Sequence, residues 1–383
     1  MQLNKIFLLA CVLLTGSCVD RFFPETARYH EVLFIECLIS DDTTSTSAVR
    51  ISISAPIATE DSSKMIYKPR GVSGAQAMIS SPDGFFKCRE TIAGTYELPT
   101  DFKVETGKSY QLQVFYNDRF FESDYQELRR SPPIDSVTYR HTVQKLSEDG
   151  EIVDGYRFFA STHDPGQGPS YYRWTLDATF LYTVPYNATH IWDGWKTNPA
   201  SNKLLRTCWK SKKVSGIYLA QTIGLSENRV TEAPLNFESQ YGDELSIRYS
   251  LNVRQYNISP SAMSFWENVD KLINKTGSLY ETQPYQLQGN IHCTTDSTFY
   301  VVGIFEVAGA STLRLFVDKP TEFQVIPVSC ILMTVGKDIP WYVLPAGSFV
   351  TEDIIKKSFL TATPSCYDCR LRDGTLEKPL FWR

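Results

Sequence analysis

Histidine and methionine are scarce in this chain of 383 residues, which holds five of each, and the histidines are scattered along it. A helical zinc motif, a nucleophile elbow around serine and a glycine-rich phosphate loop are missing as well. Runs of basic residues are also missing. The net charge is −5 and the charges are dispersed, which excludes the positive surface typical of nucleic-acid-binding proteins. Because no motif names a reaction, function has to be inferred from location and architecture.

Long apolar runs are missing too, since no stretch after residue 18 reaches the length needed to cross a bilayer. At the start of the chain, Lys5 precedes a shorter apolar run from Ile6 to Leu14, and the small residues Gly16 and Ser17 precede Cys18. This is the order of a secretory signal and a bacterial lipobox, after which the cysteine is acylated. We therefore expect residues 1–17 to be a signal peptide and Cys18 to carry lipid. The alternative is an ordinary signal in which the cysteine is incidental.

Aromatic residues, by contrast, are abundant at 13% of the chain, with 22 Phe, 21 Tyr and 7 Trp. Such enrichment favours β-strands. After a tether at residues 18–29, Glu31–Ile39 is almost continuously apolar and Val49–Ser54 alternates strictly. Further short strand patterns, bounded by Gly, Pro or Asp, continue to Val114. We predict a mainly β protein whose residues 30–130 form an N-terminal β-sandwich of immunoglobulin-like or prealbumin-like type.

A larger, mostly β domain is expected over residues 134–383, after the extended connection that Pro132 and Pro133 impose. Within it, Phe299–Ala308 and Thr312–Val317 are expected to form a hairpin across the intervening glycine. One amphipathic helix is predicted over 260–276, because Ser259 is a suitable N-cap and apolar residues then repeat at three and four. We expect its apolar stripe to lie on the domain's sheet, the alternative being a partner-binding helix.

Seven cysteines follow Cys18, so at least one is free or bonded outside the chain. We expect one or two disulfides, with the remaining thiols buried. Cys37 and Cys88 fall in two predicted strands of the N-terminal domain. They either form a disulfide or stay as two buried thiols.

Near the C-terminus, Cys366 and Cys369 are expected to staple an irregular loop, bonded to each other or to a partner such as Cys330. A zinc site completed by His292 and Cys293 is an alternative. A redox pair is a further alternative, although the βαβ context of such pairs is missing.

A loop-like stretch between Val184 and Leu205 has neither strand alternation nor a helical period. Loop Trp and Tyr side chains supply large, rigid contact areas at interfaces. We therefore predict a recognition surface at the aromatic residues in and beside this stretch, namely Tyr182, Tyr186, Trp192, Trp195 and Trp209. The alternative is that these side chains fold back and cap the sheet.

His163 and Asp164 form the one local pair of an acid and an imidazole, and we interpret them as a surface loop feature because no nucleophile is near. A catalytic pair of carboxylates leaves no sequence trace and stays open.

Several motifs occur in an order typical of one family. After the lipobox they are Ser131–Ser136, Tyr171–Trp174, Ser261–Trp266, Gly277–Tyr280, Gln283 and Pro284 through Gly289–Ile291, Gly309–Thr312 and Cys366–Trp382. Together they resemble the Bacteroidota outer-membrane lipoproteins classed as a domain of unknown function and usually encoded beside a TonB-dependent receptor. The resemblance implies a lipid-anchored outer-membrane protein that faces the cell exterior and contacts a β-barrel of the TonB-dependent receptor type. It brings no reaction, cofactor, metal or nucleic acid.

We therefore expect a non-enzymatic accessory or ligand-binding subunit of such a barrel. The alternatives are a structural or assembly factor for outer-membrane proteins and a surface hydrolase.

Overall fold

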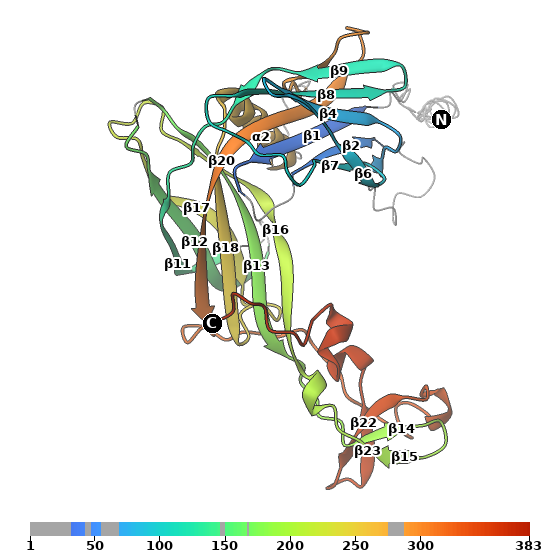
Figure 1. Cartoon of the computed structure of the whole chain (residues 1–383). Coiled ribbons are helices and arrows are strands. Elements are labelled where there is room, and N and C mark those ends of the chain that lie inside the picture. Colours follow the sequence, from blue (N-terminus) through green and yellow to red (C-terminus); the bar gives the residue numbers. More distant parts are fainter. Residues whose placement is uncertain (1–31, 43–46, 55–68, 146–149, 167, 275–286) are drawn as a thin grey trace, which may run out of the picture.

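A computed structural model describes residues 32–42, 47–54, 69–145, 150–166, 168–274 and 287–383. The predicted signal peptide, Cys18 and the tether lie outside these residues, so their assignment stays a prediction. The described chain is mainly β with one α-helix, which confirms the predicted fold class. Within the described ranges, no helix is long and apolar enough to cross a membrane. Figure 1 shows three parts in a row: an N-terminal sandwich, a middle sandwich and a small distal lobe.

The N-terminal sandwich has a sequence pattern that matches its burial. In β2, Val49, Ile51 and Ile53 point into the core, as their strict alternation predicts. The facing sheet contributes Ile79 and Leu112 to the same core. One sheet contains β1 (Leu33–Ser40), β2 (Ala48–Ile53), β3 (Arg70–Gly71), β6 (Arg89–Ile92) and β7 (Thr95–Glu97). The other contains β4 (Gln76–Ser81), β5 (Gly84–Lys87), β8 (Ser109–Tyr116), β9 (Arg119–Ser123), β10 (Gln126–Glu127) and β19 (Ile291–Cys293).

The predicted hairpin near Gly309 is wrong, because the chain there forms a single 18-residue strand, β20 (Val301–Asp318). Its first half pairs in parallel with β1, and its second half pairs antiparallel with β18 (Arg248–Asn257). A Cβ at Gly309 would lie 2.6 Å from the carbonyl oxygen of Arg129 and from the amide nitrogen of Ser131. The glycine therefore marks a close approach of two backbones and not a turn.

This long strand joins the two sandwiches into one nine-stranded sheet. The N-terminal sandwich consequently takes β19 and half of β20 from beyond residue 290, outside the predicted 30–130 range. The connection at Pro132 is buried, and its carbonyl accepts hydrogen bonds from Gln255 and Ser311. Whether the chain folds as two units that divide here stays a prediction.

The middle sandwich packs the remainder of the long sheet against a three-stranded sheet. Phe158 and Leu235 of the small sheet and Leu176 and Tyr249 of the large one share its core. The large sheet contributes β13 (Tyr171–Thr183), β16 (Thr207–Gln221), β18 and β20. The small sheet consists of β11 (Ile134–Lys145), β12 (Ile152–His163) and β17 (Arg229–Ser239).

The single helix, α2 (Pro260–Asn274), begins as predicted, because the Ser259 hydroxyl accepts a hydrogen bond from the Ala262 amide at 3.2 Å. Its apolar face packs on β20, where Phe265 joins Val302 in one buried cluster. The prediction that the stripe lies on the sheet is thereby confirmed. The predicted end of the helix beyond residue 274 lies outside the described residues.

The distal lobe is built from two segments, one between β13 and β16 and the other after β20. Figure 1 places it at the end of the molecule opposite β1, beyond the far ends of β13 and β16. Its sheet has the order β15 (Thr197–Pro199), β14 (His190–Trp192), β22 (Ser348–Asp353), β23 (Ser358–Thr361) and β21 (Met333–Thr334). Four 3₁₀ turns complete this region: η1 (Lys203–Leu205), η2 (Trp341–Val343), η3 (Pro364–Cys366) and η4 (Cys369–Arg372).

Candidate functional site

Two disulfides fix the base of the distal lobe. Cys330 bonds to Cys366, which is one of the pairings predicted for the C-terminal loop. Cys369 bonds to Cys208 on β16, a cysteine absent from the predicted disulfide residues. No local pattern marks that partner, because 161 positions separate the two cysteines.

The other cysteines in the described part of the chain, Cys37, Cys88 and Cys293, are free and buried. Cys37 and Cys88 lie in the same hydrophobic core without a disulfide between them, so of the two possibilities the second holds. Burial raises the pKa of the Cys88 thiol to about 12. The zinc alternative fails because Cys366 and Cys369 are each bonded to another cysteine. The described residues also contain no group of His, Cys, Asp or Glu arranged to hold a metal.

Three of the five predicted recognition residues support the base of the lobe from within. Tyr182 is 1% exposed, and its hydroxyl donates to the Cys369 carbonyl at 2.6 Å. Burial raises the pKa of this hydroxyl to about 12. Tyr186 is half-buried and donates to the Cys330 carbonyl. Trp209 is also half-buried, with its ring edge-on to Trp382.

The remaining two tryptophans differ from each other. Trp192 is half-buried in a small core, where its ring lies 4.6 Å from that of Trp341 and its Nε1 donates to the Leu344 carbonyl at 3.1 Å. Trp195, three residues later, lies in the turn between β14 and β15 and is 89% exposed. The Asp193 carboxylate accepts hydrogen bonds from the amides of Trp195 and Lys196 and fixes this turn. Capping and exposure therefore both occur in the predicted segment.

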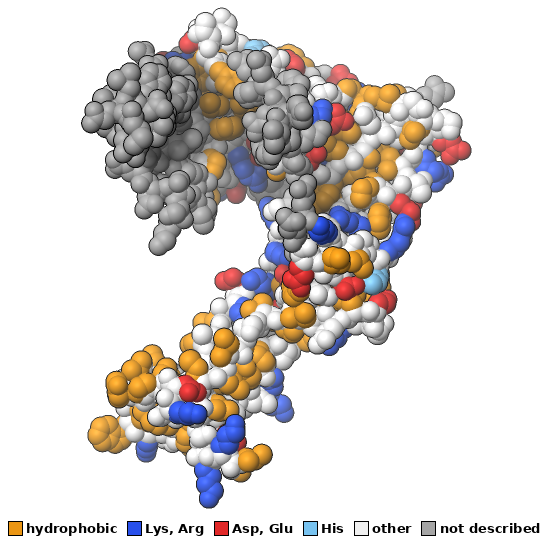
Figure 2. Space-filling view, turned by 180° about the vertical axis from the view of Figure 1, so that it is seen from behind, with side chains coloured by type: hydrophobic (Ala, Val, Ile, Leu, Met, Phe, Trp, Pro, Cys, Tyr) orange, Lys and Arg blue, Asp and Glu red, His pale blue; other side chains and the backbone are white. Residues whose placement is uncertain are grey.

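Other turns of the lobe expose large apolar side chains that the sequence analysis missed. Tyr342 in η2 is 89% exposed, and Ile354 and Ile355 between β22 and β23 are 80% and 93% exposed. Figure 2 shows hydrophobic side chains gathered over this lobe. A usable signal was present, since two isoleucines inside a turn and directly before two lysines fit no core pattern. We call Trp195, Tyr342, Ile354 and Ile355 the apolar tips.

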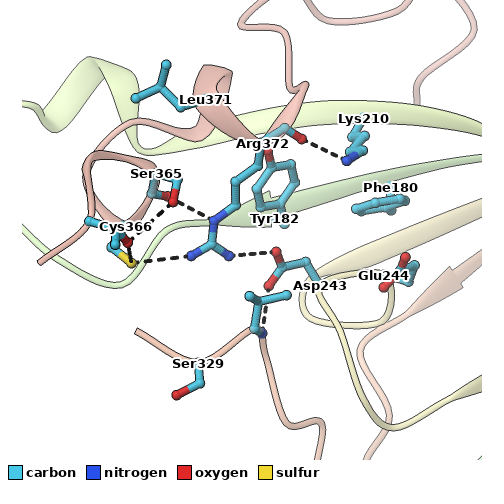
Figure 3. Close-up of a pocket in the computed structure, with 12 residues that line it drawn as sticks. Phe180, Tyr182, Lys210, Asp243, Glu244, Ser329, Ser365, Cys366, Leu371 and Arg372 are labelled. Carbon is cyan, nitrogen blue, oxygen red and sulfur yellow. Dashed lines mark hydrogen bonds and ion pairs between the residues drawn. The ribbon is translucent and has the colours of Figure 1, made fainter. Parts of the chain in front are cut away.

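A cavity of about 320 Å³ lies where the lobe meets the middle sandwich (Figure 3). Arg372 crosses it: its Nη1 donates to the Asp243 carboxylate at 2.9 Å, and its Nε donates to the Ser365 carbonyl at 2.8 Å. Lys210 of β16 donates to the Arg372 carbonyl at 2.8 Å. These charge-assisted contacts join η4, β16 and the segment before β18, so they brace the lobe against the sandwich.

His163 and Asp164, which are adjacent in the sequence, each bind a different partner in the structure. His163 contacts Asp135 on the neighbouring strand at 2.6 Å, while Asp164 accepts hydrogen bonds from the Gly166 amide and the Ser170 hydroxyl. Both interactions lie at the end of the middle sandwich, away from the lobe.

Comparison with known proteins identifies a family whose function is unknown. No curated protein sequence and no solved structure matches this chain. Residues 19–314 match the family described as a domain of unknown function, DUF4249. The match covers most of both sandwiches and ends before the second segment of the distal lobe. The chain therefore belongs to the DUF4249 family.

Proposed function

We propose that this protein is a lipid-anchored protein of the outer membrane that uses its distal lobe to contact a β-barrel of the TonB-dependent receptor type. It acts there as an accessory or ligand-binding subunit and faces the cell exterior. The motif order that resembles Bacteroidota outer-membrane lipoproteins, with Cys18 as the acylated residue, supports the location and the kind of partner. Membership of the DUF4249 family is consistent with that resemblance.

The exposure of the apolar tips carries the proposal of a partner. Soluble monomers rarely expose several large apolar side chains in one small region, and such regions mark interaction sites. Trp and Tyr are also among the residues that contribute most to interface energies. The tips lie at the end of the molecule opposite β1, the strand that follows the predicted anchor (Figure 1). A barrel that contacts them while the lipid stays in the membrane would therefore do so with a part that extends out from the membrane.

The base of the lobe supports the same role. Two disulfides and the Arg372 contacts hold it against the middle sandwich. Because the backbone beneath the tips is fixed before binding, little conformational entropy is lost when a partner docks.

The test is affinity purification of the tagged protein from detergent-solubilised outer membranes of its own organism, with the captured proteins identified by mass spectrometry. The test variant combines Trp195→Ser, Tyr342→Ser and Ile355→Ser. The control combines Phe85→Ser and Ile92→Ser, which remove side chains about 70% exposed on the N-terminal sandwich. We expect the wild type and the control to capture a TonB-dependent-type barrel, and the test variant to capture at least about tenfold less.

Equal capture by the test variant would refute the role of the lobe. Capture of barrel-assembly components in place of a receptor would favour the assembly-factor alternative. Thermal melts of all three proteins separate lost binding from lost folding.

A further inference from the structure

A second cavity lies on the face of the nine-stranded sheet that is turned away from the two cores. It has a volume of about 290 Å³. One wall comes from β1 and β2, in the N-terminal half of the sheet, and the other comes from β13, β16 and β18. Four strands separate β2 from β16 in the sheet order, so the sheet must curve to bring both to one cavity. Figure 1 shows this bend, since β20 curves from one sandwich into the other.

Each wall presents a pair of opposite charges, which strand alternation places there. Arg50 lies between two core residues of β2 and therefore points to the opposite face, and Glu36 lies directly opposite it on β1. Asp177 follows the buried Leu176 in β13, and Lys213 of β16 is its cross-strand neighbour. These four charged residues line the cavity, and each is half-buried or exposed, so a ligand can reach them.

Two further arginines of the lining are already engaged in the fold. Arg173 donates to the buried Glu306 carboxylate at 2.9 Å. Arg254 lies 2.7 Å from the Asp42 carboxylate and 3.6 Å from that of Asp177. The charges of both arginines are therefore largely balanced by carboxylates of the chain, and neither is counted among the groups offered to a ligand.

The four charges of the two walls, by contrast, are not closed into pairs. Glu36 forms no ion pair with Arg50 although the two are cross-strand neighbours, and Asp177 forms none with Lys213. Among the described residues Glu36, Arg50 and Lys213 have no ion-pair partner, and Asp177 has only the longer contact to Arg254. Since both signs are present on both walls, a ligand with a single charge is attracted by one group and repelled by its neighbour. A ligand that carries both signs matches the cavity better.

We infer that this cavity binds a zwitterion of the amino-acid type, meaning a free amino acid or a short peptide with unblocked ends. The Arg50 guanidinium presents a planar fork of donors that fits a carboxylate, which a lysine ammonium does not. The ligand carboxylate is therefore assigned to Arg50, and the ligand ammonium to Asp177 on the facing wall. The volume is near the lower end for small-molecule sites, which limits the ligand to a few residues. The inference names a ligand class for the ligand-binding role proposed above, and in that sense rests on it.

The test is a calorimetric titration of the purified full-length chain in detergent. The probes are alanine, leucine and lysine, each offered as the free amino acid, the dipeptide and the tripeptide. Every probe that binds is compared with its N-acetyl form, which lacks the ammonium, and with its C-terminal amide, which lacks the carboxylate. Acetate and phosphate serve as simple anions.

Two variants examine the two ends of the ligand separately. Arg50→Gln removes the proposed carboxylate partner, and Asp177→Asn removes the proposed ammonium partner. The matched controls are Arg89→Gln and Asp101→Asn, which change exposed residues before β13 and outside the cavity. Melting temperatures show whether each variant is folded.

We expect saturable binding of at least one unblocked probe, weakened at least about tenfold in both blocked forms, because a hydrogen bond to a charged group is lost in each. In Arg50→Gln the unblocked probe and its amide should bind equally. In Asp177→Asn the unblocked probe and its N-acetyl form should bind equally. Both controls should behave as the wild type. A merely structural role for either residue would weaken all forms of the probe alike.

Four outcomes would overturn the inference: no saturable binding by any unblocked probe, equal binding of the blocked forms by the wild type, binding of acetate or phosphate as tight as that of the zwitterions, or a uniform loss for all forms in both variants. Binding confined to amino acids, or to peptides, would support it and identify the source of the zwitterion. These titrations contain no barrel protein, so their failure leaves the co-purification result unaffected.

Discussion

Trp192→Ala should open the distal lobe locally, whereas Trp195→Ala should leave it folded. Truncating a buried tryptophan costs about 3–5 kcal/mol, and its hydrogen bond adds about 1 kcal/mol. Trp192 is half-buried against Trp341 and donates to the Leu344 carbonyl, so we expect a loss of about 2–4 kcal/mol. Trp195 is 89% exposed, and its replacement should change stability by no more than about 0.5 kcal/mol.

Native-state hydrogen exchange is the appropriate assay, because the two disulfides keep the lobe attached and its opening is local. The Gly347 amide donates to the Trp192 carbonyl, and the Thr189 amide donates to the Val350 carbonyl, so both report on the lobe. The Ile51 amide, bonded to the Gly94 carbonyl in the N-terminal sandwich, is the internal reference.

Protection of the two lobe amides should fall by about one and a half to three powers of ten in Trp192→Ala, while the reference stays constant. Unchanged protection in this variant would refute the assignment of Trp192 to the lobe core. An equal loss in Trp195→Ala would show that the exposed ring also stabilises the fold.

Three further predictions concern other parts of the chain. Arg173→Met removes the ion-pair partner of the buried Glu306, 2.9 Å away, and should lower the free energy of unfolding, measured by urea denaturation, by roughly 3 kcal/mol. Adding Glu306→Gln to this variant should restore much of the loss. Burial also raises the pKa of the Glu306 carboxyl above 4.5. The stability that this shift contributes is therefore complete below pH 4.5 and declines as the pH rises. Glu306→Gln alone should remove that decline. Gly309→Val should lower the melting temperature far more than Ala310→Val in the same strand, because a Cβ at 309 would lie 2.6 Å from a neighbouring backbone; equal shifts would contradict the close approach. Cys18→Ser should move the protein from the membrane fraction to the soluble one, and retention after a carbonate wash would argue against the lipid anchor.

Local patterns predicted the elements whose stability depends on near neighbours in sequence. The strand that contains Val49, Ile51 and Ile53 could be predicted because these apolar residues alternate with polar ones and so share one face. The helix after Ser259 needs a cap and a repeating stripe, and both are visible in the residues. In each case the residues that cause the structure lie within about four positions of one another, so the element can be recognised directly from the sequence.

Pairing between distant segments could not be read in the same way. The parallel pairing of Leu33 with Val301 joins residues far apart in the chain, and no property of either residue specifies the other. Gly309 illustrates the ambiguity, since a glycine between two strand patterns fits a turn as well as a close backbone contact. The turn was the local interpretation, and the Arg129 backbone that decides against it is not adjacent in sequence.

The candidate site shows the same limit at the level of single side chains. Trp192 and Trp195 share one loop-like segment and one composition, so sequence alone treats them alike. Trp192 is covered because Trp341 and Leu344, about 150 positions later, supply its core. Tyr182 is likewise enclosed by the second segment, where its hydroxyl donates to the Cys369 carbonyl. The role of the aromatic stretch in recognition stays a prediction, and which of its rings are exposed depends on the second segment.

The two disulfides explain how so small a lobe can leave its apolar tips exposed. Neither lobe segment is long enough to bury a large core, and small folds of this kind usually need covalent support. In the chain-entropy account, the bond closing 161 positions contributes about 5 kcal/mol and the bond closing 36 contributes about 4 kcal/mol, although the two are not additive. Each is as large as the loss expected from truncating Trp192. With stability supplied at the base, Trp195 and Ile355 are not required for the core and are available for contact with a partner.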